Sequence, residues 1–173
     1  MLLACTKKLS EVLKIKLPDI TPHSREPLCE WHANLFVFDR RKGVVMMNNQ
    51  TRYCVVLYGL KAEHFKIFGN ITLSCIKQTL LAEGFQKEII EKYIDYCSEV
   101  VFTKTYDRSV MSQMNDMIYL TSHWIEEYLP TSEICMVDLN KKLGVVPVGS
   151  LKYTYPIDNL RKALTDLRTA EQR

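Results

Sequence analysis

The chain has 173 residues, of which 47% are hydrophobic and 25% are charged, and its net charge is +3. This composition predicts one soluble domain, residues 1–173, with a full core. No apolar run approaches the ~18 residues that a membrane helix needs. The segment Met1–Lys8 is too short and too soon charged for a signal peptide. The mild positive charge leaves nucleic acid open as a partner.

The six cysteines are far apart in the sequence, and no C-x-x-C pair occurs. Disulfide frameworks belong to small secreted chains with short cysteine spacings. Most of these cysteines stand inside apolar runs, where the side chain acts as a small hydrophobe. We therefore predict reduced thiols and a cytoplasmic protein.

The first half of the chain predicts strands before helices. A short strand at 2–5 precedes a helix capped by Thr6, and prolines then mark a loop up to about residue 30. Strands at 34–39, 44–47 and 53–58, joined by turns at 40–43 and 49–51, form an antiparallel meander. Their apolar runs are nearly continuous, which indicates that both faces of the sheet are covered.

The second half is mostly helical by its periodicity. Helices are predicted at 60–65, at 72–82 with Gly84 as its stop, and at 86–96. A strand at 100–104 leads to a long helix from about Arg108, capped by Asp107 and ended by Pro130. A strand at 134–138, an irregular stretch at 143–155 and a helix from Pro156 complete the chain. The fold class is α+β, with a mostly antiparallel sheet of about five strands and packed helices.

The segment from Phe102 to Asp116 contains the densest set of chemically capable side chains. Helical spacing puts Arg108, Asn115 and Asp116 on one face. A helix start favours bound anions, so we expect an anion there. The ligand residues expected in this segment are Lys104, Thr105, Arg108, Ser109, Asn115 and Asp116. The alternative is a solvated helix face whose polar groups tie the helix to the sheet.

Other candidates lie around the first hairpin. Arg40 and Arg41 form a positive patch that suits phosphate, or a solvated hairpin tip. Trp31 could stack on a base or ring, or it could cover the core. Asn34 stands beside it in the sequence and could read a polar group of the ligand.

Signatures of catalysis and of metal binding are weak. No P-loop, nucleophile elbow or zinc-protease motif occurs, so whether the protein is an enzyme stays open. Asp116 and His123 are the weak candidates for an acid or base. His23, Cys29 and His32 have a loosely metal-like spacing, but the second ligand pair of a closed zinc site is absent. We predict no metal and no cofactor.

Three blocks resemble a family of small bacterial proteins known only as a domain of unknown function. They are W-H-A-N-L-F-V-F-D-R-R-K at 31–42, F-T-K-T-Y-D-R-S-V-M-S-Q-M-N-D at 102–116 and L-K-Y-T-Y-P at 151–156, with C-T-K-K at 5–8. The resemblance covers nearly the whole chain and implies a single compact bacterial domain. It implies no activity and no catalytic residue.

Three functions remain as hypotheses. The first is a binding module for a phosphate-bearing ligand, a nucleotide or nucleic acid. The second is an enzyme on such a ligand, such as a phosphodiester hydrolase or a toxin-like nuclease. The third is a protein-interaction subunit, such as an antitoxin or accessory protein, that forms a homodimer or binds a protein partner. No membrane partner is expected.

Overall fold

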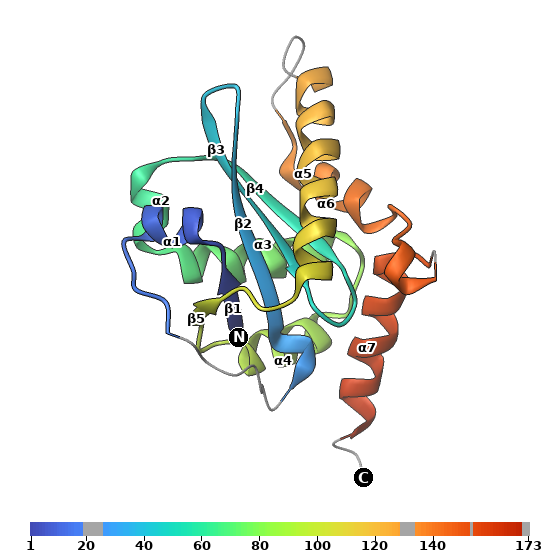
Figure 1. Cartoon of the computed structure of the whole chain (residues 1–173). Helices are drawn as coiled ribbons and strands as arrows, with labels where there is room; N and C mark the ends of the chain where they lie inside the picture. Colours follow the sequence, from blue (N-terminus) through green and yellow to red (C-terminus); the bar gives the residue numbers. More distant parts are fainter. Residues whose placement is uncertain (19–25, 129–133, 153, 171–173) are drawn as a thin grey trace.

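The computed structural model of the chain describes residues 1–18, 26–128, 134–152 and 154–170 (Figure 1). Its centre is a five-stranded sheet in the order β4-β3-β2-β1-β5. The strands are β1 (Leu2–Cys5), β2 (Glu30–Phe38), β3 (Arg41–Asn48), β4 (Cys54–Leu60) and β5 (Val101–Lys104). The fold class α+β is confirmed, with five strands in one sheet.

The sheet is mixed, so the expectation of a mostly antiparallel sheet is wrong. Strands β2, β3 and β4 form the predicted antiparallel meander. Strand β1, however, lies between β2 and β5 and is parallel to both. Parallel neighbours need long crossover connections. Here residues 6–29 connect β1 to β2, and the three helices after β4 lie on the way to β5.

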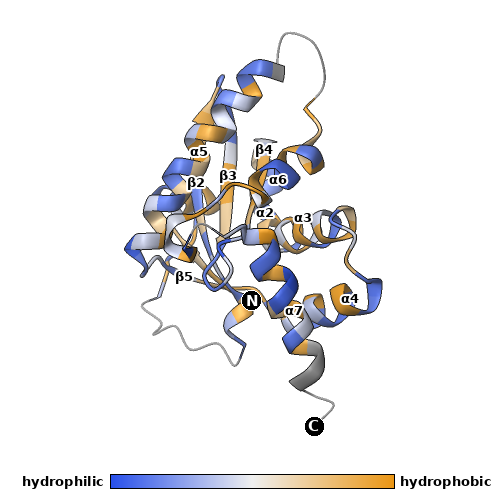
Figure 2. Ribbon diagram, turned by 90° about the vertical axis from the view of Figure 1, so that its right-hand side faces the viewer, coloured by the Kyte–Doolittle hydropathy of each residue, from blue (hydrophilic) through white to orange (hydrophobic). Residues whose placement is uncertain are grey.

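Helices cover both faces of the sheet. Apolar residues gather along the strands and the inner sides of the helices, whereas hydrophilic residues mark outer surfaces of α5 and α7 (Figure 2). The helices are α1 (Lys7–Leu13), α2 (Ala62–Lys66), α3 (Phe68–Ala82), α4 (Lys87–Tyr96), α5 (Arg108–Tyr128), α6 (Met136–Gly144) and α7 (Pro156–Ala170), with 3₁₀ turns η1 (Pro27–Cys29) and η2 (Gly149–Leu151).

The sheet divides the interior into two cores. Strand β3 shows this by alternation, because Val44 and Met46 pack with α1, α3, α4 and α7. Its other side chains, Val45 and Met47, pack with α5 and α6. All four are fully buried. A strand that is buried on both faces reads as one apolar run, and this confirms the prediction that both faces are covered.

Several local predictions are confirmed at their capping residues. The side chain of Thr6 accepts a hydrogen bond from the N–H of Leu9 and caps α1. Asp107 caps α5 through its Oδ1 atom, which accepts from two backbone N–H groups of the first turn. Gly84 follows α3 with φ = 79°, a conformation that favours glycine. Helix α7 begins at Pro156.

Two predicted elements are wrong. The hairpin turn consists of Asp39 and Arg40, both with positive φ, and not of residues 40–43. Gly43 lies instead within β3, at a position where a Cβ atom would stand 2.3 Å from the ring of Phe36. The predicted strand 134–138 is the start of helix α6, whose buried residues Leu139 and Leu143 have helical spacing. Pro130, the predicted end of α5, lies outside the described residues.

Candidate anion-binding site

A hollow of about 490 Å³ opens at the carboxyl ends of the parallel strands β1 and β5. The residues that line it come from β1, α1, the segment after α1 and the end of β5. They are Cys5, Lys7, Ser10, Ile15, Lys16, Leu17, Lys104 and Thr105. Its volume lies within the range of roughly 300–1,000 Å³ that is typical of small-molecule sites.

Local structure brings these residues together. Strands β1 and β5 are in register with Cys5 opposite Lys104, so both strands end at the same point. The cap at Thr6 then starts α1 at once and places Lys7 beside the strand ends. Lys14 ends α1 in the left-handed conformation, with φ = 56°, and the chain turns back along the hollow.

The returning segment is fixed to the sheet. The hydroxyl of Thr103 on β5 donates to the carbonyl oxygen of Pro18 over 3.1 Å. This contact brings Leu17, which is buried, and Lys16, which is exposed, against the end of β5. One wall of the hollow is therefore apolar, whereas its rim carries ammonium groups.

The electrostatics of the hollow favour an anion. Three lysines line it, and none of its described lining residues is acidic. The hydroxyl of Ser10 donates to the carbonyl oxygen of Lys7 over 2.8 Å and keeps its oxygen lone pairs. Burial raises the pKa of the Cys5 thiol to about 12, so this sulfur is a neutral thiol at pH 7 and not a nucleophile.

Directly beside the hollow, the junction between β5 and α5 contains a closed polar network. His32 on β2 is its centre and is fully buried. Its Nε2 atom accepts from the backbone N–H groups of Tyr106 and Asp107, each over 3.3 Å. Its Nδ1 atom therefore carries the proton and donates to Oδ1 of Asn49 over 2.6 Å. Burial lowers the pKa of His32, which is consistent with this neutral form.

The network continues to the protein surface on both sides. The Nδ2 atom of Asn49 donates to the hydroxyl of Tyr106 over 2.6 Å, and that hydroxyl donates to Glu30 over 2.9 Å. Asp107 lies 3.6 Å from the guanidinium of Arg52. Burial alone would raise the pKa of Asp107, but the N–H of Val110 and the charge of Arg52 outweigh it and lower that pKa.

This network occupies the start of α5, where we expected an anion. Four backbone N–H groups at that start are already bonded to His32 or to the Asp107 carboxylate. The side chains of Arg108 and Ser109 are exposed beyond them. The geometry here is that of the alternative expectation, in which polar groups tie the helix to the sheet.

The remaining predicted residues do not form one cleft. Nδ2 of Asn34 donates to Oδ1 of Asn115 over 3.2 Å, which connects β2 to α5. Asp116 is exposed on α5 and does not line the hollow. His123 lies 3.5 Å from Glu127 in an exposed i,i+4 pair. The two weak acid/base candidates therefore share no hollow with the lysines.

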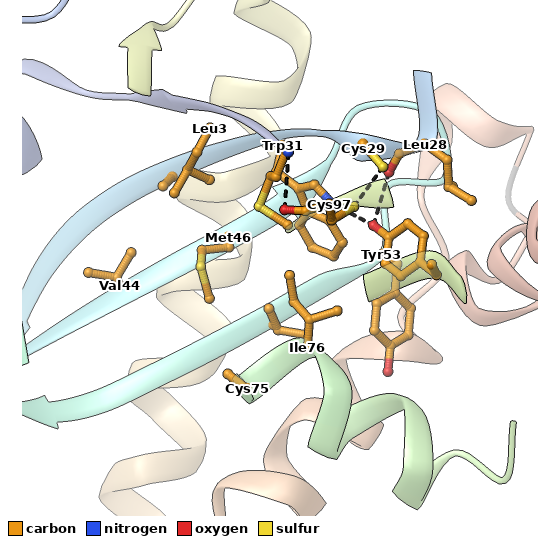
Figure 3. Packing of buried hydrophobic residues seen from close by; sticks show 14 of the residues in the cluster. Leu3, Leu28, Cys29, Trp31, Val44, Met46, Tyr53, Cys75, Ile76 and Cys97 are labelled. Atoms are coloured by element: carbon orange, nitrogen blue, oxygen red, sulfur yellow. Dashed lines mark hydrogen bonds between the residues drawn. The ribbon is translucent and has the colours of Figure 1, made fainter. Parts of the chain in front are cut away.

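Trp31 and the hairpin arginines lie elsewhere. The Trp31 side chain is 1% exposed in the core (Figure 3), and its Nε1 donates to the hydroxyl of Tyr93 over 2.9 Å. Its ring thus has no free face for stacking. Arg40 and Arg41 are exposed at the tip of the β2–β3 hairpin. Strand β2 extends five residues beyond Ala33 to Phe38, roughly 17 Å from the β1 end, and the tip lies beyond it.

Only Lys104 and Thr105 among the predicted ligand residues line the hollow, and the sequence patterns do not indicate Lys7, Ser10 and Lys16. A signal existed, since C-T-K-K follows the first predicted strand directly. It could not be used without knowing that β1 and β5 are neighbours. His32 was considered only as a metal ligand, with Cys29 and His23. His23 lies outside the described residues, and no group of three or more metal-ligating side chains occurs among those that are described.

These features define a small mixed-sheet α+β domain with a cationic hollow at one end of its sheet. A protein-family model for a domain of unknown function, DUF6933, matches residues 2–159, and the chain belongs to this family. The expected resemblance is thereby confirmed. A comparison with curated proteins found no match. Within the described part of the chain, no helix is both long enough and apolar enough to cross a membrane.

Proposed function

We propose that the protein is a binding module for a phosphate-bearing small ligand of the nucleotide class. The observation that carries this proposal is the hollow at the ends of β1 and β5, where three lysines converge and no described lining residue is acidic. Ligands of open sheets with parallel strands bind beyond the carboxyl ends of those strands. Ammonium groups are common partners of phosphate in such sites.

The two walls suit the two parts of a nucleotide. Phosphate oxygens would meet Lys7, Lys16 and Lys104 at the rim, and the hydroxyls of the hollow would supply further hydrogen bonds. The base or sugar would lie on the apolar wall formed by Ile15 and Leu17. Binding is proposed in place of catalysis because Cys5 is held as a neutral thiol, and the hollow's described lining includes no histidine or carboxylate.

Calorimetric titration with ATP, ADP, AMP, pyrophosphate and a short single-stranded oligonucleotide tests this proposal. We expect an affinity that falls with added salt, because the contacts are between charges. Lys104→Gln should lower the affinity for the probe by about tenfold, which corresponds to one charged hydrogen bond. Lys141→Gln, an exposed lysine on α6, is the matched control and should leave the affinity unchanged.

Arg108→Ala separates the hollow from the helix start. If the hollow is the site, this substitution should change the affinity by less than about twofold, since Arg108 does not line it. A loss of binding in Arg108→Ala with an unaffected Lys104→Gln would place the ligand at α5 instead. No binding of any probe at low salt would refute the proposal altogether.

A further inference from the structure

The two thiols of Cys29 and Cys97 lie in contact inside the larger core (Figure 3). Their Sγ atoms are 2.6 Å apart, although 68 positions separate the residues in the sequence. Ordinary packing leaves atoms about 3.5–4.0 Å apart, and a disulfide needs about 2.05 Å. The separation of these sulfurs is therefore closer to that of a bond than to that of packed atoms.

The backbone on both sides of the pair is held in place. Cys29 is the last residue of η1, and its neighbour Leu28 offers a carbonyl oxygen that accepts from the hydroxyl of Tyr93 over 3.0 Å. Tyr93 lies one turn before Cys97 on α4, whose C-cap is Cys97. The same hydroxyl accepts from the indole of Trp31. These bonds fix η1 against the end of α4 independently of the two sulfurs.

The N-terminus lies against this pair. The ammonium group of Met1 donates to the carbonyl oxygen of Cys97 over 3.1 Å and also to that of Glu99. Residues 98 and 99 are exposed, so the pair lies just beneath the surface although both thiols are themselves buried. A small oxidant therefore has only a short distance to cover after local opening of this end.

We infer that Cys29 and Cys97 form a dithiol that a hydroperoxide oxidises to an intramolecular disulfide. Cys97 reacts first: its thiolate takes one oxygen from hydrogen peroxide, and the hydroxide that leaves takes up the proton lost by the thiol, which gives a sulfenic acid and one water molecule. The sulfur of Cys29 then attacks the Cys97 sulfur, and the oxygen leaves as a second water molecule. Together the two thiols lose two electrons and two protons, and the peroxide is reduced to two waters.

The surroundings assign this order of reaction. Contact with the Cys29 thiol lowers the pKa of Cys97 against the effect of burial, and the Met1 ammonium acts in the same direction. The same contact raises the pKa of Cys29, with burial adding to it. Of the two sulfurs, Cys97 is therefore the one that loses its proton more readily. The other buried cysteines, Cys5, Cys54 and Cys75, have pKa values raised by burial.

The experiment uses the Cys135→Ser chain, because Cys135 is the exposed thiol among the six and would join two copies. The chain is titrated with hydrogen peroxide, and its remaining thiols are alkylated under denaturing conditions. It is then digested without reductant for mass spectrometry. We expect one cross-linked peptide pair that contains Cys29 and Cys97. The thiol count should fall from five to three and return to five after dithiothreitol.

Two variants and one physical measurement complete the test. Cys29→Ala should lose the cross-link, whereas Cys75→Ser should keep it. The oxidised parent should melt on the order of 10 °C higher, because the bond closes a long loop. The peptide map of the oxidised Cys135→Ser chain tests the inference even where a variant does not fold. A cross-link between other cysteines would overturn the inference. So would an intact dithiol at peroxide levels that fully oxidise Cys135 in the natural chain.

Discussion

The cationic hollow and the His32 network lie side by side, yet their polar groups are arranged in opposite ways. Thr105 lines the hollow, and the next residue, Tyr106, belongs to the network. In the network both ring nitrogens of His32 are bonded, and so are Asn49 and the Asp107 carboxylate. The hollow instead gathers like charges around open volume. Density of polar residues therefore does not distinguish a site from a structural tie, and it is open volume beside like charges that supports the proposed site.

The largest expected effect on stability is that of His32→Ala, which tests the structural role of the network. The substitution removes a buried ring and leaves two backbone N–H groups and Asn49 without their partner. We expect a loss of about 3 kcal/mol in the free energy of unfolding, measured by urea denaturation. His123→Ala removes an exposed histidine and serves as the control, with an expected change within about 0.5 kcal/mol. Equal effects of the two substitutions would contradict a structural role for the network.

The cap of α5 should contribute the next largest effect. Asp107→Ala takes the acceptor from the N–H groups of Ser109 and Val110 and the partner from Arg52. We expect about 1.5 kcal/mol of destabilisation in the same denaturation assay. Asp116→Ala changes an exposed aspartate inside the same helix, and there we expect no loss. If Asp107→Ala proved neutral, the start of α5 would need another explanation.

The pH dependence of stability should show the network through His32. Its folded-state pKa lies below the ordinary value of 6.5, so the unfolded chain binds the proton more tightly. Stability is then full above pH 6.5 and falls as the pH drops toward the folded pKa, by up to about 1.4 kcal/mol per pH unit. Denaturation at pH 7.5 and 5.5 measures this slope. The difference between the natural chain and His32→Ala should shrink over that interval by at most about 1.4 kcal/mol.

Asp107 does not disturb this measurement. Its pKa is lowered from 3.8, so its contribution is present above that value and is lost only at lower pH. The two groups thus act in separate pH ranges. If the natural chain lost no more unfolding free energy between pH 7.5 and 5.5 than His32→Ala does, His32 would have to be protonated in the folded state.

The sequence predicts the local structure of this region better than its role. The cap at Asp107, the helix after it and the meander of β2, β3 and β4 all follow from short-range patterns. The position of β1 between β2 and β5 does not, because parallel pairing is decided by long crossovers and not by neighbouring residues. For the same reason Lys7 and Lys104, 97 positions apart, could not be recognised as lining one hollow.

The alternation of buried residues shows a second limit. A nearly continuous apolar run predicts a covered strand but leaves open which residue faces which layer. Trp31 and His32 are adjacent, and the structure turns Trp31 into the core with α4 and His32 toward α5. One was expected to stack a ligand, and the other was considered as a metal ligand. Both side chains are instead hydrogen-bonded in the interior. The layer that each one faces is decided only when helices pack on both faces of the sheet.

The substitution with the smallest expected effect on stability distinguishes the hollow from the network most clearly, because it separates binding from folding. The double variant Lys7→Gln with Lys16→Gln removes two exposed ammonium groups from the rim of the hollow. Surface substitutions of this kind change the free energy of unfolding by about 0.5 kcal/mol or less, and reduced repulsion among the lysines would act toward greater stability. The affinity for the phosphate-bearing probe should nevertheless fall by about a hundredfold, tenfold for each lysine. Calorimetry and denaturation on the same sample separate the two effects. Unchanged affinity would mean that these lysines form only a solvated surface, and the hollow would then differ from the network in shape alone.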